Sequence, residues 1–447
     1  MKAWKKALCL CVALCMLFTF LCPALPARAF EPETPVECPS AYVLNLETGT
    51  VVYQKGADEQ RDVATLTQIV TAALVLRNYD KVKDAQITIP SWINNTLYGR
   101  NGVYTADIRA GETLSGENLL YALFIQNSME AAYALAEYLG DGDVAAFVQM
   151  MNDYAAEAGA ANTVFKNPAG LYEEGQYSTV ADMAKIIVKA MEEDERFLEM
   201  SNTYSYTLPA TEKTGQRVLA QLNYLINSTT SYYVSSANGI KAGWNNNSGR
   251  CVATLGIKNG YNYLIVLAGG QVYNESGGYL SQNVALVDAK NLLDWAFSSF
   301  TVQQIAKAGD PITEVPLRYS LASDHLSLAP NMDFYALLPT GADETTVQKV
   351  FEVPESVNAP VSLGQEVGTL VFKLADEEIG RVTLVACDEA GLSQGVFLLD
   401  FITSLFTSVW FLVILAVVLI LILLLWFFAA TRRRAKNRYK VKRHSRF

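Results

Sequence analysis

Two strand-like segments near the ends of the first three hundred residues alternate apolar and polar positions. SAYVLNLETGTVVYQK alternates on both sides of Glu47-Thr48-Gly49, which predicts a β-hairpin. GRCVATLGI and YNYLIVLAGG flank Lys258-Asn259-Gly260, and Asn-Gly between two apolar runs is the strongest short hairpin signal. Both ends of this region therefore contribute antiparallel strands.

The segment between the two hairpins has a helical period instead. In ATLTQIVTAALVL, residues 64–76, apolar side chains recur at i, i+3, i+4, i+7 and i+8 from Leu66. Residues 118–139 and 144–158 predict two further helices, and residues 280–297 predict a long amphipathic helix. Helices enclosed between early and late strands indicate an α/β (α+β) domain over residues 30–300, with one antiparallel sheet packed by helices.

Composition changes near Thr301, where short β-like stretches separated by Pro, Gly and Asp begin. The stretches that we predict as strands are residues 314–317, 333–338, 347–353, 369–374 and 381–386. They predict a small β-sandwich domain over residues 301–396.

The two ends of the chain have the composition of membrane-targeting segments. Residues 1–29 carry three lysines, a long apolar run and a final Ala27-Arg28-Ala29, which predicts a cleaved signal peptide. An uncleaved N-terminal anchor is the alternative, because the apolar run is long for a signal. Residues 409–430 contain no charge and would span roughly 33 Å as a helix, the length of a membrane-spanning segment.

The tail after this segment, residues 431–447, contains nine Lys and Arg and no acid. The positive-inside rule predicts a single-pass protein of the cell membrane with this tail in the cytoplasm and an extracellular ectodomain. Binding of the tail to nucleic acid is the competing interpretation, but its place beside a membrane helix favours contact with anionic lipid.

The ectodomain is acidic. Four of the 35 Lys and Arg lie in the signal and nine in the tail, so 22 remain against all 45 Asp and Glu, a net charge of −23. Such a surface repels polyanions, and we predict no nucleic-acid partner.

Cysteines and histidines are too few for several kinds of site. Outside the signal the chain has only Cys38, Cys251 and Cys387, and its histidines are His325 and His444. This excludes a catalyst of the Ser/His/Asp or Cys/His type in the first three hundred residues, and also a histidine-based zinc site. We predict no metal, no cofactor and no disulfide framework.

Thr65 and Gln68 are three residues apart and share one face of the predicted helix. Serine and lysine at these positions would form an S-x-x-K site, the arrangement of penicillin-binding proteins and class A β-lactamases. At this point the chain resembles the D-alanyl-D-alanine carboxypeptidases among the low-molecular-weight penicillin-binding proteins. The resemblance runs from about Ser40 to Gly391 and includes MNDYAAEAGAANTVFKNPAGL, YSTVADMAKI and NAPVSLGQEVGTLVF.

The resemblance implies a penicillin-binding-protein/β-lactamase-like domain, then a small β-sandwich and a single transmembrane helix. Where the family has S-L-T-K, S-x-N followed by D-A-A, and K-T-G, this chain has TLTQ, NSMEAA and KAG. Thr65, Gln68 and Asn127 therefore match the nucleophile, the base and the proton relay. The positions that match substrate-binding residues are Met129, Lys241, Ala242 and Gly243.

The departures from the family pattern lie where the chemistry would occur. An amide at Gln68 neither takes up the hydroxyl proton near neutral pH nor supplies positive charge. A register shift by one would make Ser128 the relay, but Glu130-Ala131-Ala132 fixes the match at Asn127. Gln176 stands where the family usually has histidine. The chain also contains a literal K-T-G sequence, Lys213-Thr214-Gly215, which we interpret as a surface turn and not as the active-site motif.

These features predict a catalytically degenerate wall protein that binds the D-Ala-D-Ala stem peptide of peptidoglycan through Lys241, or organises wall-synthesis proteins. The alternative is an active carboxypeptidase that uses Thr65 as nucleophile, with Glu130 or an ordered water as proton acceptor. A third possibility is an adaptor that binds only proteins. A class A β-lactamase is disfavoured, because a soluble drug-hydrolysing enzyme needs neither a second domain nor an anchor.

Overall fold

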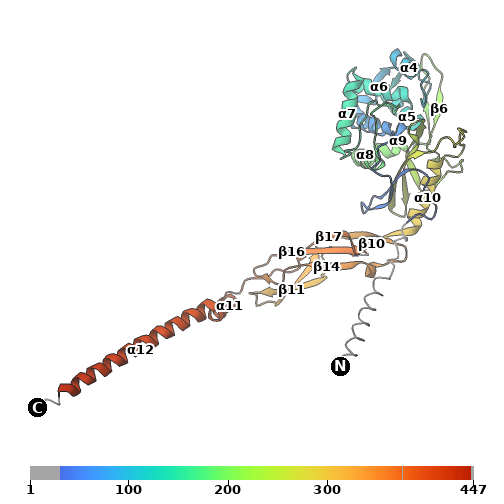
Figure 1. The fold of residues 1–447 in the computed structure, drawn as a ribbon. Helices are drawn as coiled ribbons and strands as arrows, with labels where there is room; N and C mark the ends of the chain where they lie inside the picture. Colours follow the sequence, from blue (N-terminus) through green and yellow to red (C-terminus); the bar gives the residue numbers. More distant parts are fainter. Residues whose placement is uncertain (1–30, 375, 444–447) are drawn as a thin grey trace, which may run out of the picture. The chain divides into compact units, whose positions relative to one another are not determined.

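The computed structural model describes residues 31–374 and 376–443, so the predicted signal peptide lies outside the described residues. The chain divides into two compact units (Figure 1). Among the described residues, one unit contains residues 31–302 together with Leu337–Gly341, and the other contains Gln303–Ala336 and residues 342–374 and 376–443.

A five-stranded antiparallel sheet forms the centre of the first unit, in the order β2-β1-β9-β8-β7. Its strands are β1 Ser40–Asn45, β2 Val51–Lys55, β7 Ala237–Asn245, β8 Gly249–Lys258 and β9 Tyr261–Gly270. Because β1 pairs with β9 along its whole length, the sheet joins both ends of the unit, as the sequence predicts. Both predicted hairpins are confirmed, and Asn259 and Gly260 have the positive φ angles that a tight hairpin turn requires.

Helices pack on both faces of this sheet. The helices are α2 Gln68–Arg77, α3 Tyr79–Val82, α4 Ser91–Leu97, α5 Gly116–Gln126, α6 Met129–Leu139, α7 Val144–Glu157, α8 Val180–Glu193, α9 Arg196–Ser201 and α10 Val284–Ser299. One apolar cluster joins one face of the sheet to α10, and a second joins the other face to the helices before β7.

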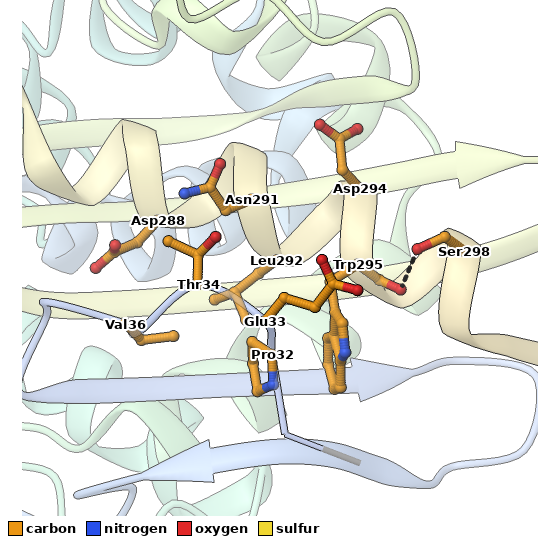
Figure 2. Close-up of a pocket in the computed structure, with 10 residues that line it drawn as sticks. All are labelled: Pro32, Glu33, Thr34, Val36, Asp288, Asn291, Leu292, Asp294, Trp295 and Ser298. Carbon is orange, nitrogen blue, oxygen red and sulfur yellow. Dashed lines mark hydrogen bonds between the residues drawn. The ribbon is translucent and has the colours of Figure 1, made fainter. Parts of the chain in front are cut away.

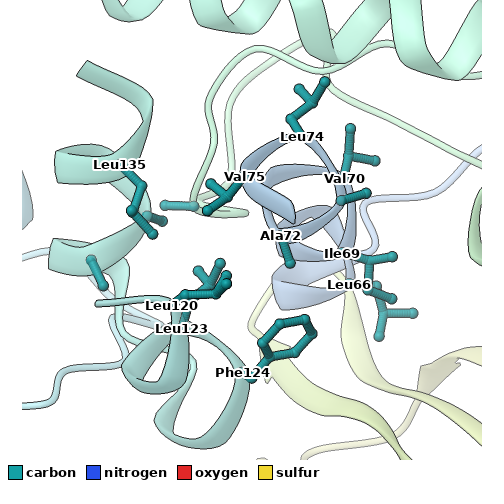
Figure 3. Packing of buried hydrophobic residues seen from close by; sticks show 14 of the residues in the cluster. Leu66, Ile69, Val70, Ala72, Leu74, Val75, Leu120, Leu123, Phe124 and Leu135 are labelled. Atoms are coloured by element: carbon teal, nitrogen blue, oxygen red, sulfur yellow. The ribbon is translucent and has the colours of Figure 1, made fainter. Parts of the chain in front are cut away.

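Helix α2 lies at the centre of the second cluster. The sequence predicts a one-sided apolar stripe from Leu66, but every residue from Ala64 to Leu76 is buried. Figure 3 shows side chains of α2 against Leu120 and Leu123 of α5 and Leu135 of α6. A helix that is surrounded by other elements buries all of its sides, so its polar positions face the protein interior.

Two predicted helix boundaries are wrong. Residues 118–139 form two helices and not one, because Asn127 adopts a left-handed conformation with φ 54° and ends α5. Ser128 then caps α6 by accepting the N–H of Ala131 at 3.2 Å. The helix predicted from residue 280 starts at Val284, because the side chain of Asn283 caps its N-terminus.

Two short hairpins complete the first unit, formed by β3 Gln86–Thr88 with β4 Thr113–Ser115 and by β5 Ser205–Leu208 with β6 Arg217–Ala220. The literal Lys213-Thr214-Gly215 lies in the turn between β5 and β6, where the Thr211 N–H donates to the Thr214 carbonyl at 2.8 Å. The prediction of a surface turn is therefore confirmed.

The second unit contains a six-stranded sheet in the order β14-β16-β17-β12-β11-β15, while β10 pairs with β13. The strands are β10 Phe300–Ala306, β11 Thr313–Arg318, β12 His325–Pro330, β13 Phe334–Pro339, β14 Gln348–Glu352, β15 Val357–Asn358, β16 Glu366–Leu374 and β17 Glu377–Ala386. Each predicted stretch falls on one of these strands, and β10, β12 and β15 were not predicted.

Two helices follow the second sheet, α11 Gln394–Thr407 and α12 Val409–Arg443. Within α12, Val409–Arg432 is long and apolar enough to cross a membrane, and no other helix of the described chain meets that test. Helix α11 was not predicted.

Candidate functional site

Thr65 lies in a short 3-10 turn, Ala64–Thr67, that leads into α2. Ala64 has a positive φ of 47° and donates its N–H to Asp62 Oδ1 at 2.9 Å. The second oxygen of Asp62 accepts a hydrogen bond from Asn245 at the end of β7, at 2.8 Å. Gly170 packs on the Ala64 carbonyl, which would lie 2.1 Å from a Cβ at that position. These contacts fix the turn between the sheet edge and a neighbouring loop.

Gln68 uses its amide as a structural donor. Its Nε2 donates to the carbonyl of Asn127 at 3.0 Å and to the carbonyl of Ala169 at 2.9 Å, so one side chain joins three segments. Its Oε1 is buried without a hydrogen-bond partner among the described atoms. The residue that matches the catalytic base therefore donates hydrogen bonds and accepts none.

Asn127 places a second amide beside the candidate nucleophile. Its Nδ2 donates to the Ala242 carbonyl at 2.8 Å and lies 3.4 Å from Thr65 Oγ1. Asn127 Oδ1 is also buried without a partner among the described atoms. The contact with Thr65 supplies a donor to the hydroxyl oxygen, whereas nucleophilic attack requires an acceptor for the hydroxyl proton.

Lys241 is turned into the domain. Its ammonium donates to the carbonyls of Leu123 at 2.7 Å and Phe124 at 3.4 Å, near the C-terminal end of α5, and the side chain is 1% exposed. Cations are favoured at a helix C-terminus, but burial lowers the pKa of Lys241 to about 7. The group expected to hold a peptide carboxylate is thus already bonded within the first unit.

The remaining predicted positions are backbone or apolar contacts. A Cβ on Gly243 would lie 2.1 Å from Thr65 Oγ1, so the strand backbone rests directly on the hydroxyl. Ala242 belongs to the apolar cluster on the α10 side of the sheet. Met129 belongs to the opposite cluster, and its N–H donates to the Tyr104 carbonyl at 3.0 Å.

Tyr104 completes the site, and the sequence pattern gave no signal for it. Its hydroxyl accepts the backbone N–H of Trp244 at 3.0 Å, while its carbonyl accepts that of Met129. Tyr104 therefore connects α6 to β7, the edge strand of the sheet. Burial raises the pKa of its phenol.

β7 is an edge strand of the sheet, and side chains bond to its outward-facing backbone groups on both sides of Gly243. The Ala242 carbonyl accepts from Asn127, and the Trp244 N–H donates to Tyr104. An extended peptide that adds to a sheet edge needs such groups, and acyl transfer needs free N–H donors where negative charge develops. Strand addition here therefore requires displacement of both side chains, whereas freeing the Trp244 N–H for acyl transfer requires displacement of Tyr104 alone.

Glu130, the acceptor considered for an active enzyme, has other partners. It accepts the hydroxyl of Ser128 at 2.8 Å and also that of Thr105, and burial raises its pKa. Ser128 itself caps α6, so Asn127 and not Ser128 contacts Thr65. No described hydrogen bond joins Glu130 to Thr65.

Gln176 supports the loop behind the site. Its Oε1 accepts the N–H groups of Lys166 at 3.0 Å and Asn167 at 3.2 Å, and its Nε2 donates to the Leu171 carbonyl at 3.0 Å. The same loop supplies the Ala169 carbonyl that Gln68 binds.

A cavity of about 340 Å³ lies away from these residues, between the leader segment and α10 (Figure 2). Glu33 and Asp294 line it with Asp288, whose carboxylate accepts the Cys38 N–H at 2.7 Å. This contact holds the start of β1 against α10, and we assign the cavity a structural role.

Parts of the chain match known families. Residues 27–271 match the family described as D-alanyl-D-alanine carboxypeptidase, and residues 300–390 match the C-terminal domain of penicillin-binding protein 5. D-alanyl-D-alanine carboxypeptidase DacF of Bacillus subtilis (strain 168) is 27% identical over 378 residues, which are 84% of this chain and 92% of the relative.

A second relative and a solved structure agree with these matches. The D-alanyl-D-alanine carboxypeptidase of Streptomyces sp. (strain K15) is 31% identical over 242 residues, which are 53% of this chain and 82% of the relative. The crystal structure of D-alanyl-D-alanine carboxypeptidase DacD from Francisella tularensis has a TM-score of 0.65 at 22% identity, covering 81% of this chain and 96% of that one. This likeness shows the same fold.

Proposed function

Because the chain belongs to the D-alanyl-D-alanine carboxypeptidase family, we propose that it acts in the cell wall as a membrane-tethered member without catalytic activity. The observation that carries the proposal is the pair of amides around Thr65. Asn127 gives the Thr65 hydroxyl a donor, and Gln68, in the position of the base, donates to two carbonyls. Neither amide can accept the proton that leaves a nucleophilic hydroxyl.

The expected loss of rate supports catalytic silence over slow activity. In a hydrolase with a catalytic triad, loss of the nucleophile or base costs on the order of 10⁶ in turnover, about 8 kcal/mol of transition-state stabilisation. Thr65 would have to recover this without a base, while the Trp244 N–H beside it remains bonded to Tyr104.

Such a protein retains two possible uses for the site. It binds the D-Ala-D-Ala end of a stem peptide along β7, in competition with Tyr104 and Asn127, or it holds wall-synthesis proteins at the membrane surface. The buried ammonium of Lys241 reaches a peptide carboxylate only if it leaves the carbonyls at the end of α5. Stem-peptide binding is therefore expected to be weak.

A labelling experiment tests the proposed loss of catalysis. The full-length chain, purified in detergent, is incubated with a fluorescent penicillin, and D-alanine release from a stem pentapeptide is measured in parallel. We expect neither covalent labelling nor release. Labelling that disappears in Thr65→Ala would establish the active carboxypeptidase instead, and an active family member serves as positive control.

A variant in which five positions are changed back to the family's residues tests whether the surrounding structure still supports the reaction. We expect it to regain labelling, and more of it when Tyr104→Phe is added, because that change frees the Trp244 N–H. Continued silence with normal thermal unfolding would contradict an intact frame. The five replacements are Thr65→Ser, Gln68→Lys, Asn127→Ser, Met129→Asn and Ala242→Thr.

A further inference from the structure

Three aromatic rings gather on the surface immediately after the K-A-G segment, and we call Trp244, Tyr273 and Tyr279 the aromatic platform. The ring centroids of Trp244 and Tyr279 are 6.2 Å apart, and those of Tyr273 and Tyr279 are 6.0 Å apart. Tyr279 is 59% exposed and Tyr273 is 43% exposed. Large side chains grouped in this way on a surface mark a binding site more often than single exposed residues do.

The two tyrosines are held in place by a tight hairpin. Tyr273 and Tyr279 face each other as an isolated antiparallel bridge, and the Asn274 N–H donates to the Gly278 carbonyl at 2.8 Å. Asn274 Oδ1 accepts the Gly278 N–H at 2.7 Å, which closes the turn. The platform is therefore ordered before any ligand arrives, which lowers the entropic cost of binding.

The hairpin is also tied to the turn that follows β7. The Tyr273 hydroxyl donates to Asn246 Oδ1 at 3.4 Å. Trp244 is the residue after Gly243, so the platform continues from the strand edge that carries the candidate peptide site. No described hydrogen bond uses the indole N–H of Trp244, which leaves a donor at the edge of the platform.

The platform is nearly free of charge. Residues 244–249 and 271–280 contain one residue that is charged at neutral pH, Glu275, and are otherwise rich in Asn, Ser and Gly. The nearby Arg250 is buried, its guanidinium lies 5.4 Å from the Tyr279 ring, and it donates to the carbonyls of Leu280 and Gln282. It is not available to hold an anion.

The chemistry of the platform fits a sugar chain better than a protein. A pyranose ring presents C–H groups to an aromatic face and hydroxyl or acetamido groups to amides, and this surface offers rings beside Asn246, Asn247 and Asn274. The aliphatic side chains of residues 244–249 and 271–280 are Val272, which is buried, and Leu280, which is half-buried, so this surface has no fully exposed aliphatic group of the kind that fills the core of a protein interface. An ectodomain of net charge −23 also favours a neutral ligand.

We propose that the aromatic platform binds an uncharged polysaccharide, the glycan strand of the cell wall, through N-acetylated sugar rings. The inference rests on the proposed function only for placing the chain at the wall. It assigns the glycan to Trp244, Tyr273 and Tyr279, and leaves the peptide to the edge of β7. The platform would hold the protein on its polymer whether or not the peptide site is occupied.

The test uses the full-length chain in a detergent without sugar groups, titrated calorimetrically with a hexamer of β-1,4-linked N-acetylglucosamine. We expect saturable binding that weakens by about tenfold in Tyr279→Ala, about 1.4 kcal/mol, because the variant lacks the ring area that the bound hexamer would cover. Tyr335→Ala, a tyrosine of the second unit that is 48% exposed, is the matched control and should bind like wild type.

Several results would overturn the inference. These are the absence of hexamer binding, binding that is unchanged in both Tyr273→Ala and Tyr279→Ala, and capture of wall-synthesis proteins by the platform without hexamer binding. If the alanine variants unfold early, Tyr279→Trp keeps an aromatic face and should bind at least as tightly as wild type; loss of binding there would also overturn it. A sugar-free peptide ending in D-Ala-D-Ala, titrated separately, tests the peptide site, so the two proposals fail independently.

Discussion

The hydroxyl of Thr65 has a hydrogen-bond donor beside it, Asn127 Nδ2 at 3.4 Å, and no described hydrogen bond gives its proton an acceptor. Two amide oxygens nearby, Gln68 Oε1 and Asn127 Oδ1, are buried without partners among the described atoms, and their nitrogens make all of the amide contacts. Unpaired buried acceptors cost free energy. The hydrogen bonds that the two amide nitrogens donate to backbone carbonyls offset this cost. Gln68 and Asn127 now connect helices, loop and sheet, which gives both residues a structural use.

Removal of one hydroxyl should open the edge of β7. In Tyr104→Phe the Trp244 N–H loses its partner, and we expect a peptide ending in D-Ala-D-Ala to bind about two- to tenfold more tightly, since a hydrogen bond is worth about 0.5–1.5 kcal/mol. Titration calorimetry measures the change. Tyr206→Phe removes a comparable hydrogen bond to Asn118, at 2.8 Å, and should leave affinity unaltered. Equal or weaker binding by Tyr104→Phe would contradict the role given to Tyr104.

Lys241 should make stability depend on pH. Its pKa is lowered from 10.5 to about 7 by burial, so between these two pH values the unfolded chain keeps a proton that the folded chain has lost. The free energy of unfolding therefore rises as pH increases from about 7 to 10.5, with a slope from this group of at most roughly 1.4 kcal/mol per pH unit.

Lys241→Met removes this group and retains its apolar stem. We expect thermal unfolding of Lys241→Met to lose the part of the rise between pH 7 and 10.5 that wild type shows. Lys258→Met, a change at an exposed lysine at the end of β8, is the control and should keep the wild-type slope. Parallel pH profiles for wild type and Lys241→Met would show that the ammonium is not buried in solution.

At the scale of elements, the sequence predicted the sheet well because its two hairpins have strong local signals. Asn259-Gly260 favours a tight turn by itself, whereas the break between α5 and α6 depends on one left-handed residue, Asn127, inside an otherwise continuous apolar period. The burial of α2 on all sides could not be predicted from the sequence, because it depends on the elements that surround the helix and not on its own apolar pattern.

The candidate site was predictable only where it follows a motif. The spacing of Thr65 and Gln68 and the resemblance of Asn127 and the K-A-G segment to the family motifs identified these positions. The structure brings them into contact with one another. Tyr104 was missed because its role comes from the fold of the loop between α4 and β4. The inward direction of the Lys241 ammonium was missed because a motif does not specify which partner a lysine chooses.

Close contact between β7 and the turn before α2 gives a test at this scale. Gly243→Ala would place a methyl group on Thr65 Oγ1, and we expect it to lower the free energy of unfolding by about 1–3 kcal/mol. Gly215→Ala is the matched control, because a Cβ there meets nothing within 4 Å and should change stability by less than about 0.5 kcal/mol. Thermal unfolding measures both.

A double variant checks the cause of the loss. Thr65→Ala removes the atom that the new methyl would strike, so Gly243→Ala should cost less in the Thr65→Ala background than in wild type. Purely additive effects would indicate that the methyl is accommodated by movement of the strand.

At the scale of the whole molecule, the apolar helix Val409–Arg432 would confine the chain to a surface. We expect the full-length protein to stay with membranes after alkaline carbonate extraction, because some twenty apolar residues in one helix are enough to span a bilayer. A variant that ends at residue 393 should be released into the soluble fraction. Release of the full-length chain by carbonate would contradict the proposed tether.

The covered edge of β7 has a further consequence under the proposed membrane tether, which would bring copies of the chain close together. An unpaired strand edge is a template on which another copy of the chain can add a strand, and this is a common route to aggregation. Tyr104 and Asn127 cover the backbone groups on either side of Gly243, so these groups are not available to pair with a strand of another copy. We expect the contacts that compete with a peptide at this edge to disfavour strand pairing between copies as well.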